Sequence, residues 1–126
     1  MSGQMDVNTL TFQLGAFSGA TEIPLVHLPT LGGGITVLDC ALHGNGAGTI
    51  VGGQIVVMTD PATGGTPAIS GTVGSFAGTI VLAAGVVHKL TVSTPYVGGT
   101  CWLGFDQTSG TAAVNSLISL SYVMGK

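Results

Sequence analysis

The sequence predicts an all-β protein: a single-domain, antiparallel β-sandwich, jelly-roll-like, with about eight strands. Short segments alternate apolar and polar residues, they recur roughly every ten residues, and clusters of Gly, Pro, Ser and Asn separate them. The one stretch compatible with a helix, around Ala112, is too short to form one. At 126 residues, the chain suits one domain whose core needs neither disulfides nor a metal.

Residues 34–43 are predicted to form the central strand of a sheet. The run begins at Gly34, the last of three consecutive glycines, and Gly44-Asn45-Gly46 follows it, so turns bound it on both sides. Both faces are mostly apolar, which predicts a second sheet over one face and a loop or neighbouring subunit over the other. The alternation places Ile35, Val37 and Ala41 on one face, and Leu38, Cys40 and Leu42 on the other.

The chain before and after this strand divides into an arm and further strands. Residues 1–8 lack a strand period and are predicted to be a flexible amino-terminal arm, which leaves 9–126 for the sandwich. Residues 8–17 alternate cleanly and indicate a half-buried strand. Pro24 and Pro29 indicate that the next strand, 22–28, lies at a sheet edge or ends early. The remaining extended segments are predicted at 49–51, 54–59, 66–76, 78–84, 86–93, 101–106 and 114–124.

Charge is scarce in this chain. Charged residues make up 6% of the sequence, against about 25% in ordinary soluble domains. Two explanations stay open: a surface made polar by Thr, Ser, Asn and Gln, or a surface covered by copies of the chain or by a larger assembly. The second predicts a homo-oligomer.

The charge and hydropathy patterns exclude several partners. A net charge of −3, with Lys89 and Lys126 as the only basic side chains, offers no footprint for nucleic acid. Apolar runs break well before the roughly 18 residues of a membrane-spanning helix, so no membrane partner is expected. The first six residues lack the pattern of a secretory signal, which predicts synthesis in a cytoplasm.

No motif in the sequence indicates catalysis, a cofactor or a metal. Cys40 and Cys101 are predicted to be buried, unpaired thiols, since a cytoplasmic protein keeps its cysteines reduced. His27, His43 and His88 are spaced too widely to indicate a shared metal site. The glycine-rich stretches match no phosphate-binding fingerprint, and there is no G-x-S-x-G elbow. We therefore expect a protein without enzymatic activity.

Two side chains stand out as candidates for contacts with other molecules. Asp39 lies in the most apolar strand, where a charge needs a partner or access to water, so we expect a hydrogen-bond anchor or an interface ion pair. Trp102 alternates with Cys101, Leu103 and Phe105, which predicts that its indole lies outside the core. There it would serve as a subunit contact or as a sugar platform, with Asp106 and Gln107 as the available polar neighbours.

Composition and two short motifs give the chain a recognisable character. Most of it is rich in Gly, Thr, Ala and Val and poor in charge. One motif is the strand entry Gly33-Gly34-Ile35-Thr36-Val37, and the other is the carboxyl-terminal Tyr122-Val123-Met124-Gly125-Lys126. In these features the chain resembles the small β-rich structural proteins of tailed-phage virions.

This resemblance implies a capsid decoration (cement) protein, often trimeric, on the outer head lattice. It would then be made in the host cytoplasm, be located in the virion, and have itself and the major capsid protein or other virion proteins as partners. A head-fibre, tail or baseplate component is the alternative within the virion, and a carbohydrate-binding jelly-roll module is the alternative outside it. The residues predicted to lie in interfaces are Met5, Val7, Asp39 and Trp102.

Overall fold

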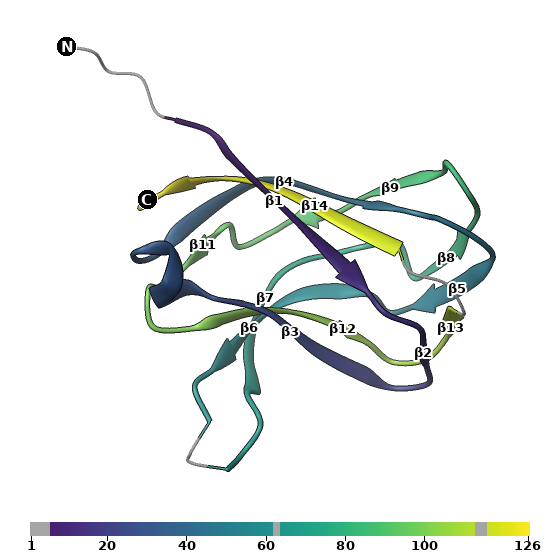
Figure 1. Cartoon of the computed structure of the whole chain (residues 1–126), viewed down its shortest axis with the longest axis horizontal. Coiled ribbons are helices and arrows are strands. Elements are labelled where there is room, and N and C mark those ends of the chain that lie inside the picture. Colours follow the sequence, from purple (N-terminus) through teal and green to yellow (C-terminus); the bar gives the residue numbers. More distant parts are fainter. Residues whose placement is uncertain (1–5, 62–63, 113–115) are drawn as a thin grey trace.

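The computed structural model describes residues 6–61, 64–112 and 116–126, and they form an all-β sandwich (Figure 1). Two antiparallel five-stranded sheets face one another, and a smaller four-stranded sheet lies at one end. The only helical element in the described segments is the short 3-10 turn η1 (Leu28–Leu31). The predicted fold class is therefore confirmed.

The first sheet contains both the first and the last strand of the described chain. Its order is β1 (Asn8–Leu14), β14 (Ser116–Met124), β4 (Ile35–His43) and β11 (Tyr96–Val97), with β9 (Val87–Lys89) also paired to β4. All neighbours are antiparallel. Because β4 has partners along both edges, the prediction of a central strand at 34–43 is confirmed.

The second sheet packs against the first across the core. Its order is β10 (Thr91–Val92), β7 (Ala68–Ser75), β6 (Gln54–Thr59), β12 (Trp102–Gln107) and β3 (Thr21–His27). The strand β3 carries Pro24 and lies at the edge of the sheet, as the sequence predicts, since proline donates no ladder hydrogen bond.

The third sheet covers one end of the sandwich, as seen to the right in Figure 1. Its order is β2 (Phe17–Ser18), β13 (Thr111–Ala112), β5 (Gly48–Val51) and β8 (Thr79–Leu82). In β8 the side chains of Ile80 and Leu82 are buried, whereas those of Thr79 and Val81 are exposed. Alternation in the sequence of 78–84 predicts these two faces, with Ile80 and Leu82 on one and Val81 on the other, and the observed burial confirms them.

The strand order is that of a jelly roll when β9, β10 and β11 are taken as one strand that changes sheets. Along the chain, β1, β3, β4 and β6 alternate between the first and second sheets, and so do β7, the β9–β11 strand, β12 and β14. The described residues form fourteen strands, more than the predicted eight. The excess arises because long extended segments bend: the run at 86–93 leaves the first sheet at β9 and joins the second at β10.

The core fills the space between the two large sheets. Phe105 and Leu103 from β12 and Ile118 and Leu120 from β14 are fully buried. Alternation in the sequence predicts that Ile118, Leu120, Tyr122 and Met124 share one face of the last strand. The first three are buried, but Met124 is 43% exposed and Val123 is buried instead, so the predicted face fails at the end of the strand; Val114 and Asn115 lie outside the described residues. The other fully buried large side chains are Leu14, Leu28, Ile35, Leu42, Ile50, Ile55, Met58 and Leu82.

A β-bulge in β4 corrects the predicted faces of the central strand. Asp39 lies opposite Ser121 and Val37 opposite Tyr122, so Leu38 has no partner residue on β14. The extra residue reverses the alternation, and Cys40 and Leu42 point into the core on the same side as Ile35 and Val37. Leu38 is 49% exposed, and the prediction that it shares a face with Leu42 is wrong.

Candidate functional site

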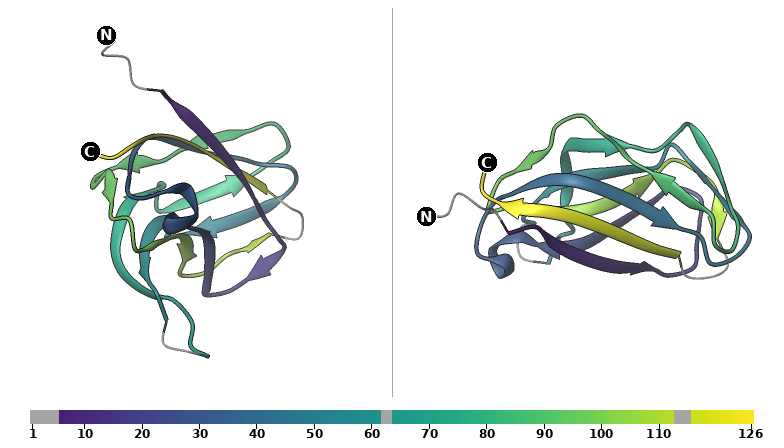
Figure 2. Two further views of the ribbon diagram at one scale, coloured as in Figure 1. Left: turned by 60° about the vertical axis from the view of Figure 1, so that its left-hand side comes forward. Right: turned by 90° about the horizontal axis from the view of Figure 1, so that it is seen from above.

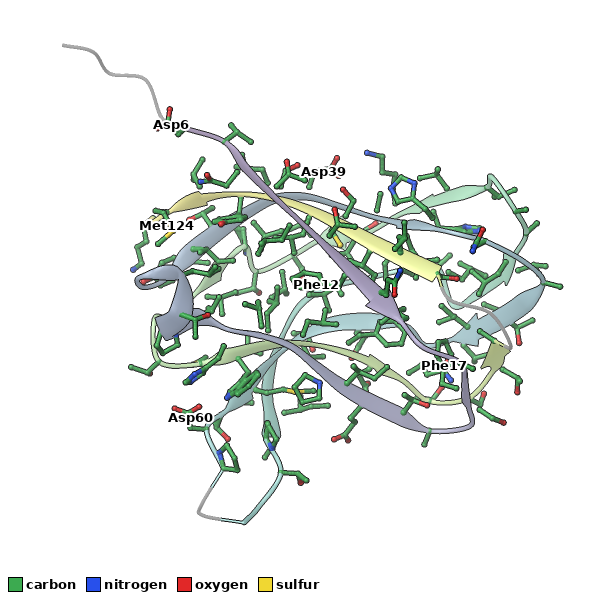
Figure 3. All side chains as sticks on the ribbon, in the orientation of Figure 1. Asp6, Phe12, Phe17, Asp39, Asp60 and Met124 are labelled. Atoms are coloured by element: carbon green, nitrogen blue, oxygen red, sulfur yellow. The ribbon has the colours of Figure 1, made fainter. Side chains whose placement is uncertain are left out.

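Trp102 anchors a polar and aromatic cluster on the outer face of the second sheet. Its partners across the strands are His27 on β3 and Met58 on β6. The imidazole of His27 stacks on the indole, with ring centroids 4.6 Å apart and an angle of 21° between the planes. The indole Nε1 donates a hydrogen bond at 2.7 Å to Oδ1 of Asp60, which follows β6 and is labelled in Figure 3. The prediction that Trp102 lies outside the core is confirmed.

Asp60 contacts two side chains of this cluster, those of Trp102 and His27. The Nε2 atom of His27 lies 2.8 Å from Asp60 Oδ1, the same oxygen that accepts the hydrogen bond from the indole. This is a short polar contact, but its geometry is not that of a hydrogen bond. Met58 is fully buried on this outer face. The imidazole occupies one face of the indole, so an aromatic platform for a sugar would be restricted to the other face.

The polar neighbours of Trp102 differ from those that the sequence indicates. Gln107 is 1% exposed, and its amide donates to the carbonyl oxygens of Gly19 at 2.7 Å and of Gly110 at 3.1 Å. Gln107 therefore fixes loops rather than serving a surface site. Asp60 is 42 residues away from Trp102 in the chain, and no local sequence pattern links the two residues.

Asp106 and Glu22 lie directly opposite each other on the same outer face. Partial burial, and secondly the charge of Glu22, raise the pKa of the Asp106 carboxyl above its usual value. Like charges at directly opposed positions of an antiparallel pair are destabilising. This pair therefore opposes folding at neutral pH.

Asp39 makes an ion pair on the outer face of the first sheet. Its Oδ2 accepts a hydrogen bond from Lys89 Nζ at 2.7 Å, and its Oδ1 accepts from the backbone N–H of Cys40 at 2.9 Å. The hydrogen bond from Lys89 is the main cause of a lowered pKa at Asp39, and partial desolvation opposes it. The expected hydrogen-bond anchor is thus present, but no sequence signal identified Lys89 as the partner.

The two other residues predicted to lie in interfaces belong to the amino-terminal region. Val7 precedes β1 and is 61% exposed. Met5 lies outside the described residues, and the assignment of residues 1–8 as an arm stays a prediction. Next to Val7, an open hollow of about 390 Å³ is lined by Asp6, Asn8, Val123 and Met124.

The histidines are on separate strands and the cysteines are free. His27 lies in β3, His43 in β4 and His88 in β9, and no group of three metal-ligating side chains occurs in the described segments. Cys40 is buried, and burial raises the pKa of its thiol to about 12. Cys101 is only partly buried, because it precedes β12 rather than lying within it, so its predicted burial is wrong. No described helix is long and apolar enough to cross a membrane.

Several large apolar side chains are exposed. They lie in or next to strands of all three sheets, so they do not form one compact patch. Those exposed by more than a third are Val7, Leu38, Ile69, Val81, Val86, Val87, Tyr96, Leu117 and Met124.

Comparison with known proteins finds similarity to solved structures but none at the level of sequence families or curated sequences. No protein-family model matches the chain, and no curated protein matches it in sequence. Among solved structures, the chain is similar to one from a structure described as "Cyanophage Pam1 capsid asymmetric unit". The two chains are 16% identical, the match covers 99% of this chain and 89% of the other, and the TM-score is 0.44.

Proposed function

We propose that this chain is a virion structural protein without enzymatic activity, and that it acts as a capsid decoration (cement) protein. In this role it binds the outer head lattice of a tailed phage and stabilises it. The observation that carries the proposal is the combination of very few charges with apolar side chains exposed on several faces. The resemblance in composition and in two short motifs supports the same class of protein.

The few charged groups leave most of the surface neutral. The chain has five acidic and two basic side chains, and Asp39 and Lys89 neutralise each other at 2.7 Å. A protein that remains alone in solution usually carries many more charges, which keep its copies apart. Exposed Leu38, Leu117 and Val87 are suited to burial against neighbouring subunits.

The polar cluster around Trp102 supports a structural rather than a catalytic role. The Asp60 oxygen that contacts His27 also accepts the hydrogen bond from the indole. In addition, the imidazole is stacked against the indole ring. These contacts hold the hairpin after β6 against β12, and we propose that the cluster stiffens this surface for contact with the lattice.

The proposal is tested by adding the purified protein to capsids that lack it. We expect the protein to co-sediment with the capsids to saturation, and the temperature at which the capsids disrupt to rise. Wild-type protein that stays in the supernatant at saturating capsid concentration would contradict the proposal.

A matched pair of substitutions locates the attachment surface. Val7 and Val81 are exposed to similar extents, 61% and 66%, but Val7 precedes β1 whereas Val81 lies in the small end sheet. We expect Val7→Asp to lower capsid occupancy and Val81→Asp to leave it unchanged, because the amino-terminal region is predicted to contact the lattice. Equal capsid occupancy of the two variants would contradict the placement of Val7 in the interface.

Two alternatives remain for the same fold. A head-fibre, tail or baseplate component would share the composition but would not saturate the head lattice. A carbohydrate-binding jelly roll is favoured by one observation, the Asp60 carboxylate beside the indole of Trp102. Retention on a glycan array that is lost in Trp102→Ala would favour this binding module.

A further inference from the structure

The free edges of the sheets are not equally protected against pairing with another chain. The edge strand β3 contains Pro24 and a register irregularity opposite Leu103 and Gly104. The outermost strands β10 and β2 have two residues each, β11 also has two, and β8 has four. Proline, irregular pairing and short length are the usual means by which proteins prevent association at sheet edges.

The strand β1 has none of these protections. It runs for seven residues, and its register with β14 is continuous from Asn8 opposite Tyr122 to Leu14 opposite Ser116. It contains no proline, glycine or charged residue. Among the described residues its ladder pairing is to β14 alone, so its other edge has no strand partner (Figure 2). A long, regular, uncharged edge of this kind is a template for another strand.

The side chains of β1 indicate which strand fits. Leu10 and Phe12 face the core but are only partly buried, because they lie at the rim of the sandwich. Thr9, Thr11 and Gln13 face outward and are exposed. A partner strand that placed apolar side chains beside Leu10 and Phe12, and uncharged polar ones beside the threonines, would complete both faces.

We propose that this partner is β1 of a second copy, paired antiparallel about a two-fold axis through Thr11. In this register, Asn8 is opposite Leu14 of the copy, Leu10 is opposite Phe12, and Thr11 is opposite Thr11. All seven residues are paired, and every core-facing residue meets another core-facing one. Shifting the centre by one residue in either direction leaves strand ends unpaired.

Electrostatics permits this pairing although each chain carries a net charge of −3. The strand itself has no charge, and the nearest acidic residue, Asp6, precedes it. In the antiparallel arrangement, the two Asp6 residues lie at opposite ends of the paired strands. The first sheets of the two copies then form one continuous sheet, with partly buried Leu10 and Phe12 covered by their counterparts.

The proposed contact has two-fold symmetry, so the unit in solution is a dimer. The resemblance to decoration proteins alone implies a trimer, and the geometry of β1 favours a pair instead. This inference does not depend on attachment to a capsid, because it concerns the free protein.

Cysteine substitution tests the register directly. In Thr11→Cys, the two introduced thiols lie directly opposite, at the Cα separation of about 4.5–5.5 Å found in antiparallel pairs and compatible with a disulfide. In Thr9→Cys, each introduced thiol is opposite Gln13 of the copy, so the two thiols are about 13 Å apart along the strands. Under mild oxidation we expect Thr11→Cys to form a covalent dimer and Thr9→Cys to remain uncrosslinked, with native Cys40 and Cys101 as common background.

A charge-swap experiment tests the symmetry. Thr11→Lys and Thr11→Glu each place like charges opposite one another and should weaken the dimer about tenfold or more, as measured by sedimentation equilibrium. Mixing equal amounts of the two variants should restore a dimer, which native mass spectrometry identifies as the mixed species. Unchanged circular dichroism spectra verify that both variants are folded.

Three results would overturn the proposal. The wild-type protein could be monomeric at micromolar concentration, which would leave β1 free or available to a different protein. It could be a trimer whose mass is unaffected by Thr11→Lys. Finally, Thr9→Cys could crosslink as efficiently as Thr11→Cys, which would exclude the register centred on Thr11.

Discussion

Asp39 and Asp106 both lie on outer sheet faces, but their surroundings shift the pKa of each carboxyl in opposite directions. The hydrogen bond from Lys89 lowers the pKa of Asp39. Partial burial and the facing Glu22 raise the pKa of Asp106. The ionised form of Asp39 therefore stabilises the fold above its unfolded pKa, and this contribution is lost as the pH falls through the folded pKa. The ionised form of Asp106 destabilises the fold, and acidification relieves the penalty.

We expect Asp106→Asn to raise the free energy of unfolding at neutral pH by about 0.5 kcal/mol, because it removes the repulsion of Glu22. Asp39→Asn should lower it by about 0.5 kcal/mol, the size expected of an exposed ion pair. Urea unfolding at several pH values measures both effects, and each should shrink as the pH falls below the carboxyl range. A stabilising effect of Asp106→Asn that persists in acid would contradict this explanation.

The two cysteines should differ in reactivity. Burial holds the thiol of Cys40 protonated, with a pKa of about 12, and only the thiolate is nucleophilic. Cys101 is partly exposed. In the folded protein we expect iodoacetamide to label Cys101 and to leave Cys40 unmodified until denaturant is added, as mass spectrometry of peptides would show. Labelling of Cys40 at the rate of Cys101 would mean that the core opens readily.

The buried side chain of Cys40 also contributes to packing. Cys40→Ala should lower the free energy of unfolding by about 1 kcal/mol through lost packing.

At the scale of the elements, alternation of residues predicted most strands but not their interruptions. The strand at 54–59 has the bounds of β6, and the faces of 78–84 are correct. The bulge at Leu38 was missed because it depends on the register with Ser121, far away in the sequence. The split of 86–93 at Leu90 was missed because one bend there moves the chain between two sheets.

Only part of the candidate site was predictable, because alternation indicates where a side chain points but not which residues of other strands lie next to it. The outward position of Trp102 follows from alternation along its own strand. Its neighbours His27 and Asp60 come from other segments, and only the paired strands bring them together. The ion pair of Asp39 with Lys89 likewise spans 50 residues. Local sequence therefore gave the direction of these side chains, whereas their partners depend on topology.

The packing of β12 on β6 leads to a prediction about Gly104. A Cβ atom at this position would lie 2.5 Å from Met58 Cε, 2.7 Å from Met58 Sδ and 3.0 Å from the Ile23 carbonyl oxygen. We expect Gly104→Ala to lower the free energy of unfolding by about 1–2 kcal/mol, because the buried Met58 must move. Gly71→Ala is the matched control, since no atom lies within 4 Å of its added Cβ. Equal stability of the two variants would contradict this packing.

At the scale of the whole molecule, a jelly roll with few charges presents large neutral surfaces and, at β1, an unprotected strand edge. Its first and last described strands, β1 and β14, are neighbours, so the edge that we propose for pairing belongs to the same sheet as the last described strand (Figure 1). The Val7 region precedes this edge, whereas the cluster of Trp102 lies on the other large sheet. Pairing of β1 edges therefore leaves the Trp102 cluster free for contact with a lattice, whereas Val7 lies directly beside the paired edge.

The central claim is that the chain covers a phage head, and its copy number in purified particles tests this most directly. Quantitative mass spectrometry of density-purified virions, with labelled peptides of this chain and of the major capsid protein as standards, gives the ratio of the two. A decoration protein predicts a copy number of the same order as that of the major capsid protein. Absence from the particles, or only a few copies in each, would contradict decoration, and a few copies would indicate a fibre, tail or baseplate component instead.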